Sequence, residues 1–266
     1  MSEWILQYLY LPQDLSSHGH ELDSLTGWVH LLMLILFVGW GAFYLLTVFK
    51  FNKKRNPSAD YKGVKTHVSS YLEITVAVIE AVLLVGFSIP LWADVVDNIP
   101  EETAKDVVPI RIIAEQFAWN IHYAGPDGKF GRTAPELVDL SNGNPVGIDK
   151  NDPNAADDVT TVNQLNVPMN KQILVKLTSK DVIHSFFLPV MRVKQDAIPG
   201  SEFPLKFTAV SKGDNDGKYE IACAQLCGLG HYRMRGYYNI MTQEEFDAWM
   251  GEQQELLKAA GEDDGW

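Results

Sequence analysis

Two long apolar runs lie in the first third of the chain. Residues 25–49 contain no Asp, Glu, Lys or Arg, and the run at 74–93 is interrupted only by Glu80. At about 1.5 Å per residue, either run in helical form reaches across a hydrocarbon core of about 30 Å. A buried core helix is the alternative, but a charge-free run of this length is typical of a membrane span. We therefore expect two transmembrane helices, at about 25–49 and 71–94, the second kinked at Pro90.

Beyond residue 94 the apolar residues come in shorter runs rich in β-branched side chains. Stretches with Gly, Pro, Asn and Asp separate these runs and indicate turns. Short strands broken by turns predict an antiparallel β-sandwich or barrel over residues 95–241. Residues 125–166 hold few large apolar side chains, so we expect a surface insertion there. The strands are expected within residues 107–123, 172–179, 203–210 and 219–225.

The segment after residue 241 has the apolar spacing of a helix. Thr242 can serve as its N-cap, with Glu245 three residues later, which is the pattern of a capping box. We expect a short C-terminal helix followed by a tail, together covering residues 242–266.

The basic residues that precede the β-rich region all lie between the two apolar runs. The positive-inside rule therefore places this loop in the cytoplasm, and residues 1–24 and 95–266 on the other side of the membrane. A cleaved signal peptide is the alternative for the first run, but acidic residues precede the run where a signal peptide has a basic start. We expect a two-pass protein of the bacterial inner membrane, with both termini and the β-domain in the periplasm. The basic residues are Lys50, Lys53, Lys54, Arg55, Lys62 and Lys65.

The two cysteines, Cys223 and Cys227, lie in a segment that also holds His231 and Met234. A disulfide, a redox-active dithiol and a metal site are the possible interpretations. An oxidising compartment favours a disulfide, whereas the C-x-x-x-C spacing differs from the C-x-x-C of redox dithiols. Two thiolates, an imidazole and a thioether form a soft ligand set that selects copper. Two cysteines with so few nearby histidines suggest two copper ions that share bridging thiolates.

Such a site needs a second histidine, and His184 is the candidate. It lies at the end of a strand pattern in residues 180–200. A lone histidine in that place is usually an ordinary strand residue, but a nearby cluster that lacks one ligand favours ligation.

The chain resembles subunit II of the haem–copper cytochrome c oxidases over nearly its whole length. The family motif C-x-x-x-C-x-x-x-H-x-x-M is met at residues 223–234, and VIHSFFLP with KQDAIPG resembles the family segment around its first histidine ligand. The resemblance implies a two-helix transmembrane hairpin followed by an all-β cupredoxin-like domain, a Greek-key sandwich or barrel. It also implies a binuclear copper centre, CuA, in that domain. The implied ligands are His184, Cys223, Cys227, His231, Met234 and the backbone carbonyl of Gln225.

Four positions refine what the resemblance implies. Gln225 stands where the family usually has a Glu that helps to hold a nearby Mg²⁺, which puts that ion in doubt. Phe117 stands where the family has the tryptophan that receives electrons from cytochrome c, and Trp119 matches the second tryptophan. These two aromatic residues are the candidates for the point where electrons enter. Glu73, seventeen residues before Pro90, matches the family's Glu at the start of a proton path, and an ordinary interfacial carboxylate is the alternative.

The resemblance implies a subunit of a cytochrome c oxidase that is not catalytic alone. It accepts electrons from cytochrome c and passes them to the haem of subunit I, where O₂ reduction is coupled to proton pumping. The implied partners are subunit I, other oxidase subunits, membrane lipid, and a donor that is a separate cytochrome c or a membrane complex such as alternative complex III. No nucleic-acid partner is expected. The 27 acidic against 16 basic residues after residue 93 suit a basic donor, although solubility alone would also explain them.

Three other functions share part of the pattern. A quinol oxidase subunit II has the hairpin and the fold but lacks the copper ligands, and nitrous oxide reductase has CuA without such a hairpin. A membrane-anchored copper carrier without an oxidase role needs exposed, exchangeable ligands. It also gives no reason for Glu73 or for two helices.

Overall fold

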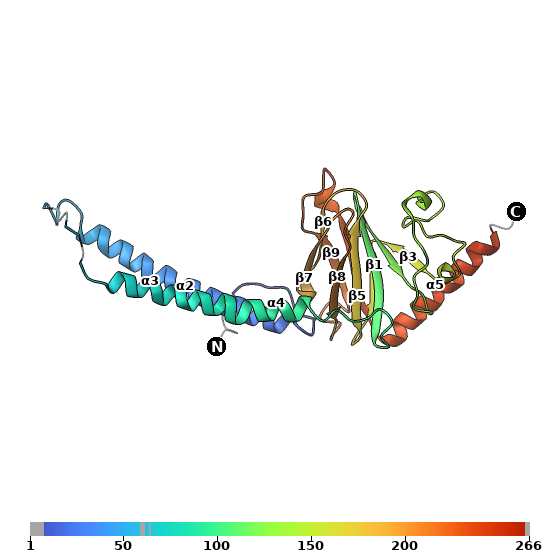
Figure 1. The fold of residues 1–266 in the computed structure, drawn as a ribbon, viewed down its shortest axis with the longest axis horizontal. Coiled ribbons are helices and arrows are strands. Elements are labelled where there is room, and N and C mark those ends of the chain that lie inside the picture. The colour runs from blue at the N-terminus through green and yellow to red at the C-terminus, as the bar shows by residue number, and fades with distance from the viewer. Residues whose placement is uncertain (1–7, 59–61, 64, 264–266) are drawn as a thin grey trace. The chain divides into compact units, whose positions relative to one another are not determined.

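The computed structural model describes residues 8–58, 62–63 and 65–263, with side chains up to residue 259 (Figure 1). Of the described residues, 8–11 and 20–95 form one compact unit, and 12–19 and 96–263 form the other. The parts of the expected N-terminal segment, loop and tail at residues 1–7, 59–61, 64 and 264–266 lie outside the described residues.

The first unit is built from two apolar helices. Both are long and apolar enough to cross a membrane, and none of the residues in their most apolar stretches is buried. An exposed apolar surface of this extent needs lipid or another protein against it. The two predicted helices are therefore confirmed. They are α2 (Gly19–Lys50) and a continuous segment of α3 (Val68–Ala81), the π-helical η1 (Val82–Ser88) and α4 (Ile89–Val96).

Both helices extend beyond their predicted bounds. The helix α2 begins at Gly19 rather than at residue 25, because a helix continues through polar residues such as Glu21 that the apolar pattern leaves out. Where the sequence predicts a kink at Pro90, the structure has the π-helical η1 just before it. Proline has no N–H to donate to the carbonyl four residues back, and a π-helical stretch is one way to absorb the interrupted ladder.

The second unit is a sandwich of two five-stranded sheets. Its strands are β1 (Val107–Glu115), β2 (Ala118–Tyr123), β3 (Val159–Val162), β4 (Gln164–Pro168), β5 (Gln172–Ser179), β6 (His184–Leu188), β7 (Val193–Ala197), β8 (Phe203–Thr208), β9 (Lys218–Cys223) and β10 (Arg235–Met241). One sheet has the order β3-β2-β1-β5-β8 and the other β4-β10-β9-β6-β7. The predicted β-sandwich is confirmed, with two parallel pairs, β1 with β5 and β4 with β10, that the sequence did not predict.

The core lies between the two sheets. In β1 the side chains of Ile110, Ile112 and Ala114 are buried and those between them are half-exposed, which is the period of a strand with one face on the core. Short 3₁₀ turns connect several strands. They are η2 (Pro135–Leu137), η3 (Pro153–Ala155), η4 (Pro189–Met191) and η5 (His231–Arg233).

The single strand predicted within 107–123 is a hairpin in the structure. Glu115 at the end of β1 pairs with Ala118 at the start of β2, so Gln116 and Phe117 form the turn between them. The sequence lacks the Gly, Asn or Asp that marks most tight turns, and for that reason the pattern predicted one strand.

The predicted insertion at 125–166 is shorter than expected. Residues 159–166 belong to β3 and β4, which pair with β2 and β10. Leu165 is fully buried in β4. The residues next to it in the chain are polar, so the sequence shows no apolar pattern from which β3 and β4 could be predicted. Residues 125–158 form the remaining loops, which include η2 and η3.

Residues 12–18, predicted as part of a separate N-terminal segment, pack on the β-domain. The Leu15 N–H donates to the carbonyl of Val190 at 2.9 Å, and the Leu15 carbonyl accepts from the N–H of Val210 at 2.9 Å. The Leu15 side chain is buried in the core. A single leucine in a polar segment carries no pattern from which this contact could be predicted.

The chain continues into the helix α5 (Gln243–Asp263) after the last strand. The Thr242 hydroxyl accepts from the N–H of Glu245 at 3.2 Å, and the Glu245 carboxylate accepts from the N–H of Thr242 at 2.7 Å. The predicted capping box and C-terminal helix are therefore confirmed. The helix packs on the sandwich through Phe246.

Candidate metal centre

Neighbouring strands and one loop bring the candidate ligands together. His184 is the first residue of β6 and Cys223 is the last residue of β9, and the two strands are paired with Phe186 opposite Cys223. The loop after β9 carries Cys227, and η5 at its end begins with His231. The strands fix the positions of His184 and Cys223, and the loop brings Cys227 and His231 close to them.

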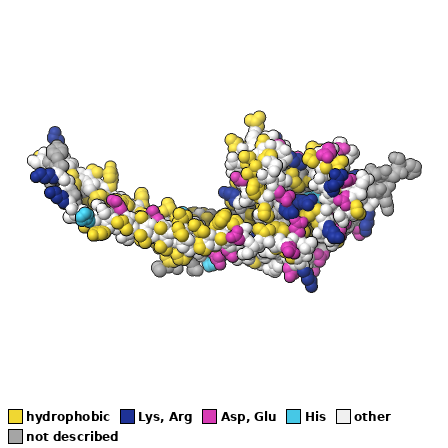
Figure 2. All heavy atoms as spheres, in the orientation of Figure 1, with side chains coloured by type: hydrophobic (Ala, Val, Ile, Leu, Met, Phe, Trp, Pro, Cys, Tyr) yellow, Lys and Arg dark blue, Asp and Glu magenta, His cyan; other side chains and the backbone are white. Residues whose placement is uncertain are grey.

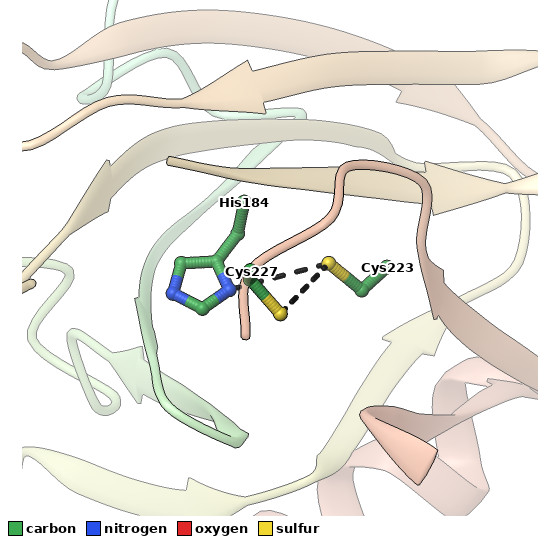
Figure 3. A group of neighbouring side chains, drawn as sticks. All are labelled: His184, Cys223 and Cys227. Carbon is green, nitrogen blue, oxygen red and sulfur yellow. Dashed lines mark hydrogen bonds between the residues drawn. The ribbon is translucent and has the colours of Figure 1, made fainter. Parts of the chain in front are cut away.

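Three of the side chains form a compact group (Figure 3). The Sγ atoms of Cys223 and Cys227 are 3.8 Å apart, and Cys223 Sγ lies 4.0 Å from His184 Nδ1. The ligand atoms of all three residues lie within 4.8 Å of one another. Both cysteines are free, because a disulfide needs its sulfur atoms about 2.05 Å apart.

The remaining candidates surround this group. Met234 Sδ lies 3.1 Å from His184 Nδ1 and 3.6 Å from Cys227 Sγ. His231 Nδ1 lies 3.6 Å from Cys227 Sγ. The backbone carbonyl of Gln225 lies 3.2 Å from Cys223 Sγ. The structure therefore gathers all six donor atoms that the sequence pointed to.

These spacings fit donors that share a metal ion. With metal–sulfur bonds of about 2.3 Å and metal–nitrogen bonds of about 2.0 Å, tetrahedral geometry places two sulfurs about 3.8 Å apart and sulfur and nitrogen about 3.5 Å apart. The Cys223–Cys227 and Cys227–His231 separations of 3.8 and 3.6 Å are close to these values. Thiolate, thioether and imidazole donors together suit copper.

The four other donors surround the two thiols. Met234 lies beside His184, whereas His231 lies beside Cys227 and the Gln225 carbonyl lies beside Cys223. Six donors exceed what a single four-coordinate ion uses, and a thiolate sulfur can bridge two ions. The geometry thus has room for a pair of ions held by shared thiolates.

A carboxylate that the sequence reasoning missed orients one of the histidines. Asp181 Oδ1 lies 2.9 Å from His184 Nε2, and the Asp181 carboxylate also accepts the N–H groups of Gln116 and Val182, each at 2.7 Å. With Nε2–H donated to Asp181, Nδ1 is the nitrogen left to bind a metal. The only sequence signal was an Asp three residues before the candidate histidine.

The thiols and His184 strongly influence one another. Burial lowers the pKa of His184, but its contacts with Cys223 and Asp181 outweigh burial and raise it. Burial likewise raises the pKa of Cys223, but hydrogen bonding from His184 and from the Ser185 N–H lowers it to about 6. Burial and the neighbouring Cys223 raise the pKa of Cys227 to about 11. One thiolate therefore forms readily, and the second forms when a cation compensates its charge.

The turn between β1 and β2 supports the loop that carries the ligands. The Gln116 side-chain amide donates to the carbonyl of Cys227 at 2.6 Å. The ring of the half-buried Phe117 lies against the backbone of Gly230, where an added Cβ would come within 2.5 Å of it. Both contacts hold the loop from one side. Sequence reasoning marked Phe117 but missed Gln116.

The two aromatic candidates differ in exposure. Trp119 is fully buried beneath the centre, with its ring centroid 6.2 Å from that of His184. Phe117 is partly exposed at the turn. The Gln225 side chain is exposed, and Glu73 lies in α3 of the other unit.

The family model for cytochrome c oxidase subunit II, periplasmic domain, matches residues 108–243. The alternative cytochrome c oxidase subunit 2 of Bradyrhizobium diazoefficiens is 28% identical over 89% of this chain and 79% of its own length. Cytochrome c oxidase subunit 2 of Cereibacter sphaeroides is 28% identical over 86% of this chain and 75% of its own length. The crystal structure of the periplasmic domain of cytochrome oxidase subunit II from Bradyrhizobium japonicum aligns at 27% identity over 60% of this chain and 99% of that one, with a TM-score of 0.39.

Proposed function

The chain belongs to the cytochrome c oxidase subunit II family, part of a membrane-anchored oxidoreductase complex, and we propose that it is the subunit through which electrons enter that oxidase. It accepts electrons from reduced cytochrome c and passes them to the haem of subunit I, where O₂ reduction is coupled to proton pumping. The convergence of six soft and neutral donor atoms at one end of the β-sandwich carries this proposal.

The residues present fit a binuclear copper centre, which would supply a one-electron acceptor and donor. Cys223 and Cys227 would hold both ions through their thiolates. His184 and Met234, whose donor atoms lie 3.1 Å apart, would add ligands on one side. His231 and the Gln225 carbonyl would add ligands on the other.

The protein around the donors holds them firmly and buries three of them, whereas Cys223 and His231 are half-exposed. Cys227 and Met234 are each 3% exposed, and His184 is fully buried. Asp181 fixes the tautomer of His184, and Gln116 fixes the loop through the Cys227 carbonyl. Ligands that cannot move change little when the charge of the site changes, which favours fast electron transfer. The same burial disfavours the copper-carrier alternative, which needs exchangeable ligands.

Electrons reach the centre at its exposed end. Trp119 is fully buried, so a docked protein cannot touch it, and Phe117 is the better of the two aromatic candidates. The acidic residues after residue 93 attract a basic donor and raise the encounter rate at low salt. The donor is a separate cytochrome c or a membrane cytochrome complex.

The membrane hairpin sets the orientation. The basic loop between the helices faces the cytoplasm, and the β-domain lies in the periplasm of a bacterial inner membrane. Glu73, in α3 near this loop, is the proposed start of a proton path into subunit I. Binding of Mg²⁺ at Gln225 is weak or absent, because an amide is a weaker ligand than a carboxylate for this hard cation.

Substitutions of the donors test the proposal on the purified, copper-loaded full-length chain in detergent. Cys223→Ser and Cys227→Ser abolish the visible absorption of the copper thiolate centre, because each removes one bridge. Met234→Leu shifts the spectrum, whereas Met250→Leu, the same change in α5, leaves it as in the parent. Full absorption in either serine variant would exclude bridging by both thiolates.

A further inference from the structure

A cavity lies between the two membrane helices, at the end of the hairpin opposite the basic loop. Its volume is about 570 Å³, which is within the range of about 300–1,000 Å³ found for sites that hold small organic ligands. Residues near the start of α2 form one wall, and residues of η1 and α4 form the other. All of these residues belong to the same compact unit.

The lining of the cavity changes from polar to apolar along α2. His20, Glu21 and Ser24 lie in the first turns of the helix, and Trp28 follows one turn later, within the charge-free run. A tryptophan at such a boundary is typical of the place where a helix enters the hydrocarbon of a membrane. A membrane lipid has the same order of polar and apolar parts, because its headgroup is followed by acyl chains.

The π-helical η1 forms much of the apolar wall. Leu83 and Phe87 both belong to η1 and both line the cavity. The Ser88 hydroxyl donates to the carbonyl of Leu83 at 3.1 Å and so satisfies a polar group inside this segment. π-Helical turns are rare and are often found at functional sites. An empty apolar wall loses dispersion contacts, so a cavity open to a bilayer takes up the chains around it.

The end of the hairpin that holds the cavity is acidic. Residues 1–49 and 66–104 contain no Lys or Arg. Glu21 lines the cavity, and Asp23 and Asp94 lie within one turn of other lining residues. Figure 2 shows Lys and Arg side chains gathered at the opposite end of the hairpin, at the basic loop. An anionic headgroup therefore meets no Lys or Arg from these segments, and the charge favours a ligand with a positive group.

We propose that the cavity binds one membrane phospholipid whose headgroup carries a primary ammonium group, as phosphatidylethanolamine does. The carboxylate of Glu21 accepts hydrogen bonds from the ammonium group, and the lipid phosphate accepts from the ring N–H of His20 and the hydroxyl of Ser24. One acyl chain fills the apolar part of the cavity. A choline headgroup has no N–H to donate, and a glycerol headgroup leaves the lipid anionic, so both lipids bind more weakly.

Native mass spectrometry of the delipidated full-length chain in detergent tests the headgroup contact. We expect one phosphatidylethanolamine per chain, bound about tenfold more tightly than phosphatidylcholine or phosphatidylglycerol with the same acyl chains, because hydrogen bonds to a charged group contribute at least this factor. Glu21→Gln lowers the affinity for phosphatidylethanolamine about tenfold. Asp94→Asn is the matched control, because this exposed carboxylate does not line the cavity, and it leaves the affinity unchanged.

A second pair of variants tests the apolar part of the cavity. Leu83→Trp fills it and abolishes binding, whereas Leu84→Trp, at a neighbouring position that is exposed and does not line the cavity, keeps the parent affinity. Equal affinity for the three lipids, or parent-like affinity in Glu21→Gln, would overturn the proposal. Unchanged binding in Leu83→Trp would place the lipid elsewhere on the chain and overturn it as well.

Photolabelling of the complete oxidase shows whether the lipid is present when the other subunits are. With phosphatidylethanolamine that carries a diazirine in its acyl chain, we expect cross-links to residues 83–91 of this chain. Cross-links confined to other subunits would mean that a neighbouring subunit fills the cavity, and they would contradict the proposal. The lipid site does not depend on copper, so a chain that binds the lipid but no copper would contradict the proposed function alone.

Discussion

Replacing Asp181 by asparagine tests how the protein prepares His184 for a metal. The carboxylate accepts three N–H groups, from the His184 ring and from the backbones of Gln116 and Val182. An asparagine keeps the shape of the side chain but loses the charge and one acceptor oxygen. Its amide N–H₂ must then face a donor, either the ring N–H of His184 or the backbone N–H of Gln116.

The size of the effect follows from these contacts. A hydrogen bond to a charged group contributes about 1.5–3 kcal/mol, and loss of the carboxylate weakens the bond that selects the His184 tautomer. This corresponds to about 10- to 100-fold weaker copper binding, the range found when a partner of a metal-bound histidine is removed. The fold itself should survive, because Asp181 is partly exposed at the end of a strand.

The assay is competition for copper between the purified full-length chain and a chelator, followed by the visible absorption of the site. Asp106→Asn is the matched control. This exposed carboxylate directly precedes β1, pairs with Lys171 and touches no candidate ligand. We expect Asp181→Asn to lose copper at 10- to 100-fold lower chelator concentration, and Asp106→Asn to behave like the parent. Equal copper retention in both variants would refute the orienting role of Asp181.

Three further changes probe other parts of the molecule. Glu73→Gln slows steady-state oxygen consumption by the complete oxidase while the copper spectrum and its reduction rate stay unchanged, and normal turnover would make Glu73 an interfacial carboxylate. Growth in manganese yields no stoichiometric Mn²⁺ signal beside the copper centre, because Gln225 offers a neutral oxygen. Gln225→Glu supplies a carboxylate and should produce this Mn²⁺ signal. A strong Mn²⁺ signal in the parent would contradict the expectation. Gly230→Ala places a Cβ within 2.5 Å of the Phe117 ring, so it should shift the copper absorption and lower the stability by about 1–3 kcal/mol in thermal unfolding; a parent-like spectrum and melting temperature would show that the ring does not support the loop.

The sequence predicted the parts of the fold that follow from local pattern. Long apolar runs with at most one charged residue predict membrane-length helices directly, and the capping box at Thr242 locates the start of α5. The clustering of Cys223, Cys227, His231 and Met234 within twelve residues made most of the donor set visible without a structure.

The features that the sequence did not show all depend on contacts between distant segments. Leu15 enters the core of a domain that begins eighty residues later, and the polar strands β3 and β4 are fixed by their neighbours in the sheets. Gln116 and Asp181 touch the donor group from turns far from the cysteine motif. A side chain that holds another by one hydrogen bond leaves no periodic or compositional pattern, so only the folded chain reveals it.

Copper content and electron paramagnetic resonance of the oxidised full-length chain test the central claim most directly. Purified alone in detergent and loaded with copper, the chain has no other metal centre from subunit I to confuse the count. We expect two copper ions per chain and one unpaired electron whose hyperfine pattern arises from two equivalent copper nuclei. One copper ion per chain, or hyperfine splitting from a single nucleus, would contradict it.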